Sequence, residues 1–223
     1  MKKMIALMIA LMMGITLVAC DEGKTDKKVS DSDVIAGGWT LPESPVVTDE
    51  VKTVLAKATD GLAGATYEPV AYLGSQVVAG TNHRILCKFT PSTKNAKTTY
   101  AIVTVYEDLE GKAEITGILN SEAEVQVTDE AIDGGWTLPE SFEVTEDAAS
   151  SLRKASENVV GASYHPVALL GIQVVAGTNY CLLCEITPVT ENPESHYAVV
   201  VVYNGADGNT HVLETFDFTA EAE

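Results

Sequence analysis

The chain has 223 residues, of which 14 are Lys or Arg and 32 are Asp or Glu, so its formal net charge at pH 7 is −18. A surface this acidic repels a phosphate backbone, which excludes nucleic acid as the expected partner. The length leaves room for one large domain or for two domains of about 100 residues each.

The first 19 residues have the pattern of an export signal. Two lysines, Lys2 and Lys3, precede an apolar run over residues 4–19, and the run closes on the sequence LVAC, which ends at Cys20. This closing sequence resembles the lipobox of bacterial lipoproteins. The resemblance implies removal of residues 1–19, lipidation of Cys20 with palmitate among the acyl chains, and a lipid anchor in a membrane of the bacterial cell envelope. A plain secretory signal is the alternative.

Residues 20–33 follow as the lipidated cysteine and a polar, charged segment without apolar periodicity. Such a composition is typical of a flexible tether. Beyond it, a shift of about 97 residues superimposes the chain on itself without a gap, with about 40 of about 90 aligned positions identical. We therefore predict two tandem domains, repeat one over residues 34–127 and repeat two over residues 128–223.

Each repeat predicts one helix followed by four strands. In repeat one, Thr48 is a candidate N-cap, and apolar residues recur at helical spacing from Val51 to Leu62. Period-two patterns then predict strands over residues 67–78, 81–90, 100–107 and 113–119. The expected fold class is α+β, with one helix packed across a four- to five-stranded antiparallel sheet in each domain.

One stretch, QVVAGTN, is identical in the two repeats and begins at Gln76 and at Gln173. A strand that ends in a tight turn at Gly80 or Gly177 explains the glycine. Two adjacent valines cannot both face a one-sided core, because neighbours on a strand point to opposite faces. The retained stretch therefore indicates a constraint besides core packing.

This stretch, placed after a capped helix and a pair of glycines, resembles the first inhibitory hairpin of the cystatins, inhibitors of papain-like cysteine proteases. The disulfide-free stefins are the most similar subgroup. The resemblance covers nearly the whole of each repeat and implies an N-terminal trunk and two hairpins that occlude the cleft of the protease. The implied contacts in repeat one are Ala36, Gly37, Gly38, Gln76, Val77, Val78, Ala79, Gly80 and Leu109. Those in repeat two are Gly134, Gly135, Gln173, Val174, Val175, Ala176 and Gly177.

The second hairpin departs from the family pattern. Many cystatins carry Pro-Trp there and stefins carry Leu-Pro, whereas this chain has DLEG from Asp108 and GADG from Gly205. Leu109 provides an apolar tip in repeat one, and repeat two has none. We therefore expect repeat one to be the tighter inhibitor.

The remaining aromatic and sulfur residues predict structural roles. Trp39 and Trp136 are expected to pack the trunk against the sheet. The CxxC spacing of Cys181 and Cys184 lies on a predicted strand, where the two side chains face opposite ways and the Cα atoms are too far apart for a disulfide. Cys87 and Cys184 are expected to be buried, and Cys181 to lie nearer the surface and to be free.

The sequence does not predict an enzyme. The four histidines have no histidine counterpart in the other repeat, so the two repeats share no acid, base or nucleophile constellation. No phosphate loop or metal-ligand spacing appears, and no cofactor or metal is expected. The alternative function is a membrane-anchored binding module that uses the same scaffold for a partner other than a protease.

Overall fold

The computed structural model describes residues 37–124, 127–128 and 134–220. The predicted signal peptide (1–19), the tether with Cys20 (20–33), and Ala36 lie outside the described residues. The described residues after 36 belong to one compact unit.

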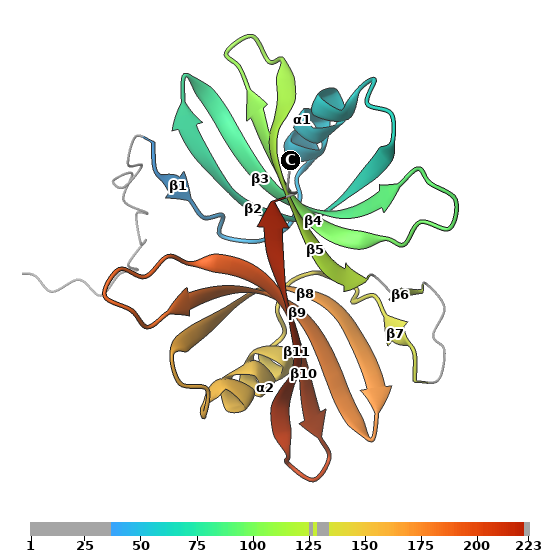
Figure 1. The fold of residues 1–223 in the computed structure, drawn as a ribbon, viewed down its shortest axis with the longest axis vertical. Helices are drawn as coiled ribbons and strands as arrows, with labels where there is room; N and C mark the ends of the chain where they lie inside the picture. Colours follow the sequence, from blue (N-terminus) through green and yellow to red (C-terminus); the bar gives the residue numbers. More distant parts are fainter. Residues whose placement is uncertain (1–36, 125–126, 129–133, 221–223) are drawn as a thin grey trace, which may run out of the picture. The chain divides into compact units, whose positions relative to one another are not determined.

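Each repeat contains one helix followed by four long antiparallel strands (Figure 1), which confirms the predicted α+β class. The elements of repeat one are β1 (Trp39–Thr40), α1 (Asp49–Thr59), β2 (Ala65–Val78), β3 (Gly80–Pro91), β4 (Thr99–Glu107) and β5 (Ala113–Glu124). The short β6 (Val127–Thr128) precedes those of repeat two: β7 (Trp136–Thr137), α2 (Glu146–Ser156), β8 (Ala162–Val175), β9 (Gly177–Pro188), β10 (His196–Gly205) and β11 (Thr210–Ala220).

The helices begin where the sequence predicts. The hydroxyl of Thr48 accepts a hydrogen bond from the amide of Val51, and Thr145 accepts one from Ala148 at the start of α2. Helix α1 ends at Thr59, so Leu62 does not extend its apolar stripe and is instead 53% exposed. The expectation for Leu62 is wrong because Gly61 takes a φ of +75°, which turns the chain out of the helix.

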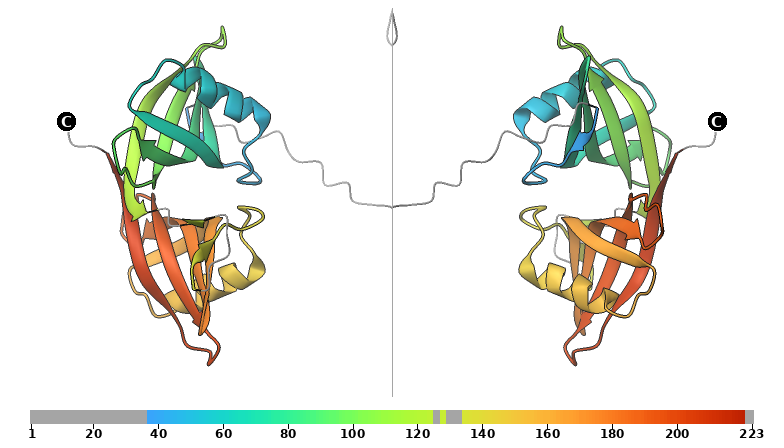
Figure 2. Two further views of the ribbon diagram at one scale, coloured as in Figure 1. Left: turned by 90° about the vertical axis from the view of Figure 1, so that its right-hand side faces the viewer. Right: turned by 90° about the vertical axis from the view of Figure 1, so that its left-hand side faces the viewer.

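Each helix lies across one face of its own strands (Figure 2). Val54 and Leu55 of α1 pack on Ile85 and Cys87 of β3 in one core cluster. Leu152 of α2 belongs to the equivalent cluster of repeat two. Ser151, which replaces Val54 in repeat two, is buried and donates to the carbonyl of Asp147.

The opposite face of the strands is also buried, which the one-sided pattern did not predict. Leu86, which alternates with Ile85 and Cys87 along β3, joins a third cluster that contains residues of both repeats, such as Leu183 and Val199. A strand covered on both faces carries a continuous apolar run, as residues 198–202 of β10 do. The repeats therefore share part of their core.

Strand pairing also joins the repeats. Over the described residues, eleven strands form one sheet in the order β1-β2-β3-β4-β5-β11-β10-β9-β8-β7-β6. The junction is an antiparallel pairing of residues 119–121 of β5 with residues 218–220 of β11. The boundary near residue 127 between two tandem domains stays a prediction.

Candidate functional site

The first hairpin of each repeat requires glycine at its turn. Val78 pairs with Gly80 across Ala79, and Gly80 has a φ of +131°. A Cβ atom at Gly80 would lie 2.4 Å from the carbonyl oxygen of Glu107, and one at Gly177 would lie 2.4 Å from that of Asn204. The backbone of this turn therefore lies in close contact with the start of the second hairpin. A side chain at the glycine would force the two hairpins apart.

Polar contacts hold the N-terminal glycine beside this hairpin. The amide of Gly37 donates to the carbonyl oxygen of Val77 over 3.3 Å, and the Nε2 of Gln76 donates to the carbonyl oxygen of Gly37 over 2.7 Å. The Nδ2 of Asn82 donates in turn to the Oε1 of Gln76 over 2.7 Å and orients its amide. We call the Asn-Gln-Gly chain of hydrogen bonds the trunk clamp.

Repeat two contains the same clamp. Asn179 donates to Gln173 over 2.6 Å, and Gln173 donates to the carbonyl oxygen of Gly134 over 2.8 Å. The clamp and the turn account for the retention of Gln, Gly and Asn in QVVAGTN by structure alone. The two valines and the alanine still lack a structural explanation.

A tyrosine joins the two hairpins in each repeat. The hydroxyl of Tyr106, near the end of β4, donates to the carbonyl oxygen of Ala79 over 2.5 Å. Tyr203 does the same to Ala176 over 2.7 Å. The two tyrosines stand 97 residues apart, at equivalent positions of the repeats, and were not predicted to have a role. Their identity in both repeats, just before the second hairpin, was the available signal.

The valines of the first hairpin point away from any core. Val77 and Val78 are 50% and 44% exposed, and Val174 and Val175 are 68% and 41% exposed. In both repeats the tip therefore presents uncharged, apolar side chains to solvent on a turn that other contacts hold rigidly. Such a surface has no packing function within the described residues.

The second hairpin lies beside the first. Thr81 pairs with Glu107, so the residues 108–111 begin next to the QVVAG turn. The Oδ1 of Asp108 accepts hydrogen bonds from the amides of Glu110 and Lys112, both over 2.9 Å, which closes the loop and leaves Leu109 86% exposed. In repeat two, Asp207 accepts from Asn209 over 3.0 Å, and the tip residue is Ala206.

The structure therefore brings three predicted elements together at one end of each repeat: the trunk glycine, the first hairpin and the second hairpin. We call this the hairpin end. Gly37 and Gly134 both have positive φ, of +82° and +73°, and are followed by Gly38 and Gly135. Ala36 lies outside the described residues.

The three cysteines among the described residues lie in strands β3 and β9. Cys87, Cys181 and Cys184 are free. Cys184 belongs to the helix-side cluster, whereas Cys181 packs against the cluster shared by both repeats, so the two side chains face opposite ways as predicted. Cys181 is partly buried, and desolvation raises its pKa to about 12, as it does for Cys87. Both thiols are protonated at neutral pH.

The described residues contain neither a candidate metal cluster nor a candidate membrane-spanning helix. None of their His, Cys, Asp and Glu side chains gather in a group of three suited to a metal ion. Neither of their helices is long and apolar enough to cross a membrane.

Comparison with known proteins does not assign the chain to a family. No protein-family model matches it, and a search of curated proteins finds no significant match. Any assignment of function must therefore come from the sequence pattern and from the geometry of the hairpin ends.

Proposed function

We propose that the chain is a reversible inhibitor of papain-like cysteine proteases, of the cystatin type, with one inhibitory hairpin end per repeat. The observation that carries the proposal is the meeting of the trunk glycine, the QVVAG turn and the second hairpin at one end of each repeat. The resemblance to cystatins implies that these three elements contact the protease.

The physical properties of the hairpin end suit a narrow protease cleft. Val77, Val78 and Ala79 can enter such a cleft without burying an unpaired charge, a step that costs several kcal/mol for a carboxylate or ammonium. The trunk clamp and the Tyr106 hydrogen bond hold the turn before binding, so little conformational entropy is lost on association. In the proposed complex the hairpin end fills the cleft around the catalytic cysteine of the enzyme.

The seam between the repeats leaves both hairpin ends accessible. It uses residues 119–121 and 218–220, near the C-terminal ends of β5 and β11, whereas the second hairpins precede the N-terminal ends of these strands. We therefore expect each chain to bind two enzyme molecules. Because the repeats share a core cluster, the tests use the whole exported chain rather than separate repeats.

The test is a titration of papain with the chain from Asp21 onward, followed by peptide-substrate hydrolysis. The proposal expects saturable, reversible inhibition and a stoichiometry of two enzymes per chain. Changing Val77 and Val78, or Val174 and Val175, to Asp should remove one enzyme equivalent. Val189→Asp is the matched control, because Val189 is 75% exposed and follows the strand end remote from the turn.

Absence of inhibition at micromolar concentrations of a well-folded chain would overturn the proposal. The alternative, a binding module for a non-protease partner on the cell envelope, would then become the working hypothesis.

A further inference from the structure

Repeat one and repeat two differ at one position of the surface where they meet. Arg84 of β3 occupies in repeat one the place that Cys181 of β9 occupies in repeat two. Each follows the Asn of the trunk clamp by two residues, so its side chain emerges on the same face of its strand.

In repeat one the arginine lies between two aromatic rings. Its guanidinium carbon is 4.0 Å from the centroid of the Trp39 ring and 6.0 Å from that of Tyr197, a residue of repeat two. A guanidinium over the face of a tryptophan is a favourable cation–π arrangement. The side chain of Arg84 therefore occupies an aromatic slot formed by both repeats.

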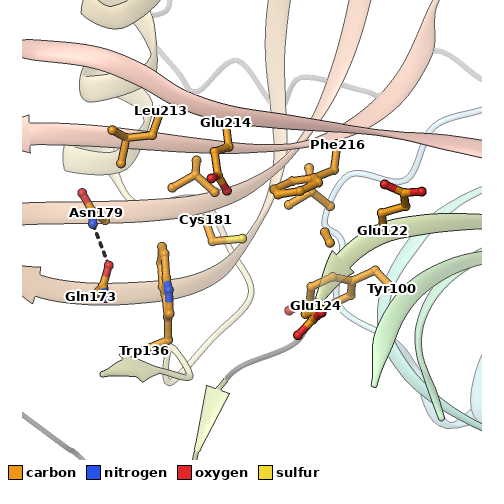
Figure 3. A pocket seen from close by; sticks show the side chains of 13 residues that line it. Tyr100, Glu122, Glu124, Trp136, Gln173, Asn179, Cys181, Leu213, Glu214 and Phe216 are labelled. Carbon is orange, nitrogen blue, oxygen red and sulfur yellow. Dashed lines mark hydrogen bonds between the residues drawn. The ribbon is translucent and has the colours of Figure 1, made fainter. Parts of the chain in front are cut away.

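The corresponding slot beside Cys181 is open. A cavity of about 500 Å³ is lined there by Cys181, by Trp136 and by Tyr100, which are the equivalents of Arg84, Trp39 and Tyr197 (Figure 3). The volume is in the range of pockets that hold small ligands. The aromatic walls of the slot are thus retained, while the cation that fills the first slot is replaced by a short thiol.

The charges around the cavity favour a cation. The carboxylates of Glu122, Glu124 and Glu214 line it, and no basic residue is among its described lining residues. Glu124 pairs with Lys97, but the ion pairs found among the described residues involve neither Glu122 nor Glu214. Glu214 stands where repeat one has Gly117, so at this position the slot without an arginine has a carboxylate that the other slot lacks.

We propose that this cavity binds a guanidinium group, which occupies over Trp136 the position that Arg84 occupies over Trp39. Two sources carry this group: a small arginine-like molecule, and an arginine side chain of a bound peptide. The cavity borders the hairpin end of repeat two, because Gln173 and Asn179 of its trunk clamp are also among the lining residues (Figure 3). The proposed guanidinium contacts are with Trp136 and the nearby carboxylates, so binding can be measured without a protease.

Tryptophan fluorescence can test the proposal directly, because Trp39 and Trp136 are the two tryptophans of the chain. In the Trp39→Phe variant of the chain from Asp21 onward, emission reports Trp136 alone. We expect a saturable change on titration with methylguanidinium or with blocked arginine amide at millimolar concentrations. Blocked citrulline amide, which is similar in shape but neutral, should give none. An equal response to citrulline amide, or no saturable response to either cation, overturns the proposal.

Two substitutions locate the response. Cys181→Arg supplies the side chain that fills the slot of repeat one and should abolish the titration, whereas Cys181→Ser should preserve it. Glu214→Gly restores the residue of repeat one, is exposed, and should weaken binding about tenfold. If Cys181→Arg does not fold, the titration of Glu214→Gly tests the location of the site. An affinity for methylguanidinium that is unchanged in Glu214→Gly overturns the assignment of the site to this cavity.

The two sources give different results. Equal affinity for methylguanidinium and for a Gly-Arg-Gly peptide with blocked ends indicates a small-molecule ligand. Affinity for the peptide that is higher by about tenfold or more indicates contacts beyond the guanidinium and hence an arginine side chain of a partner.

Discussion

The side-chain amide of Gln76 donates a hydrogen bond to the carbonyl oxygen of Gly37 over 2.7 Å, across 39 residues of sequence. This hydrogen bond holds the start of repeat one beside the first hairpin, which the resemblance to cystatins implies is inhibitory. Because Gln76 also accepts from Asn82, its two amide atoms have separate functions. The donor can therefore be removed without removing the acceptor.

The substitution Gln76→Glu removes the donor of this side chain and keeps its acceptor. The carboxylate still accepts from Asn82 but cannot donate to Gly37, so we expect the free energy of unfolding to fall by about 1 kcal/mol. Release of the trunk should also raise the inhibition constant of repeat one for papain. The measurement uses a chain in which Val174→Asp and Val175→Asp abolish inhibition by repeat two. In the same chain Gln173→Glu is the control, and it should leave the inhibition constant of repeat one unchanged.

Gly80→Ala tests the close approach of the two hairpins. Gly80 and Gly61 both have positive φ, but a Cβ at Gly61 meets nothing within 4 Å, whereas one at Gly80 lies 2.4 Å from a backbone oxygen. Gly61→Ala should lower stability by about 1 kcal/mol through backbone strain alone. Gly80→Ala should lower it by about 1 to 3 kcal/mol more. Urea denaturation compares the two, and equal losses would contradict the predicted clash.

Leu109→Ala separates binding from stability. The side chain is 86% exposed, so its truncation should leave the free energy of unfolding within about 0.5 kcal/mol of the original. Loss of an apolar contact of this size should weaken inhibition by repeat one about tenfold, toward the strength of repeat two with Ala206. Val160→Ala, at a 98% exposed position, is the control and should change neither quantity.

His83→Tyr should reduce the loss of stability in mild acid. Desolvation lowers the pKa of His83, with the nearby Glu107 carboxylate acting in the opposite direction. The unfolded chain therefore binds a proton more readily than the folded chain as the pH falls below about 6.5, the ordinary pKa of histidine, and the histidine destabilises the fold in that range. Tyr180 stands at the equivalent place in repeat two, which makes tyrosine the matched replacement.

The measurement for His83 is the free energy of unfolding at about pH 7.5 and about pH 5.5, before most carboxylates titrate. The original chain should lose more stability between these values than His83→Tyr. An identical loss in both proteins would show that His83 does not contribute to this pH dependence.

Cys20→Ser tests the predicted anchor. The full-length protein expressed in a bacterium should fractionate with membranes and dissolve in detergent, whereas the variant should be released from the membrane fraction. Mass spectrometry of the mature chain should find acyl groups on Cys20. A freely soluble protein with an unmodified Cys20 would exclude the lipoprotein hypothesis.

Much of the fold could be predicted because its signals are local. A threonine followed by acidic residues and an apolar stripe predicts a helix start wherever the segment lies, and Thr48 and Thr145 both cap helices. Alternating apolar residues likewise predict strands. Because the unit is duplicated, each of these patterns occurs in both repeats and supports the same prediction twice. The trunk glycines and the first hairpin could be selected because their residues are unchanged between the repeats.

The contacts that complete the hairpin ends were less accessible to prediction. The sequence showed that Gln76 and Asn82 are retained but not that they hold Gly37, because a hydrogen bond between residues so far apart in the chain leaves no periodic pattern. Tyr106 was missed for the same reason. A retained polar residue in a strand has several structural explanations, and only the coordinates distinguish among them.

The amino-acid sequence by itself determined two copies of one α+β unit and the residues at their exposed turns. It could do so because helix propensity, helix capping and the alternation of apolar residues act over a few residues of the chain. Tertiary structure decided how the copies join, because the edges of β5 and β11 pair through backbone groups that every residue carries. It also decided that Arg84 fills an aromatic slot while Cys181 leaves the equivalent slot open. Each slot has one wall from each repeat, so neither repeat could reveal it alone.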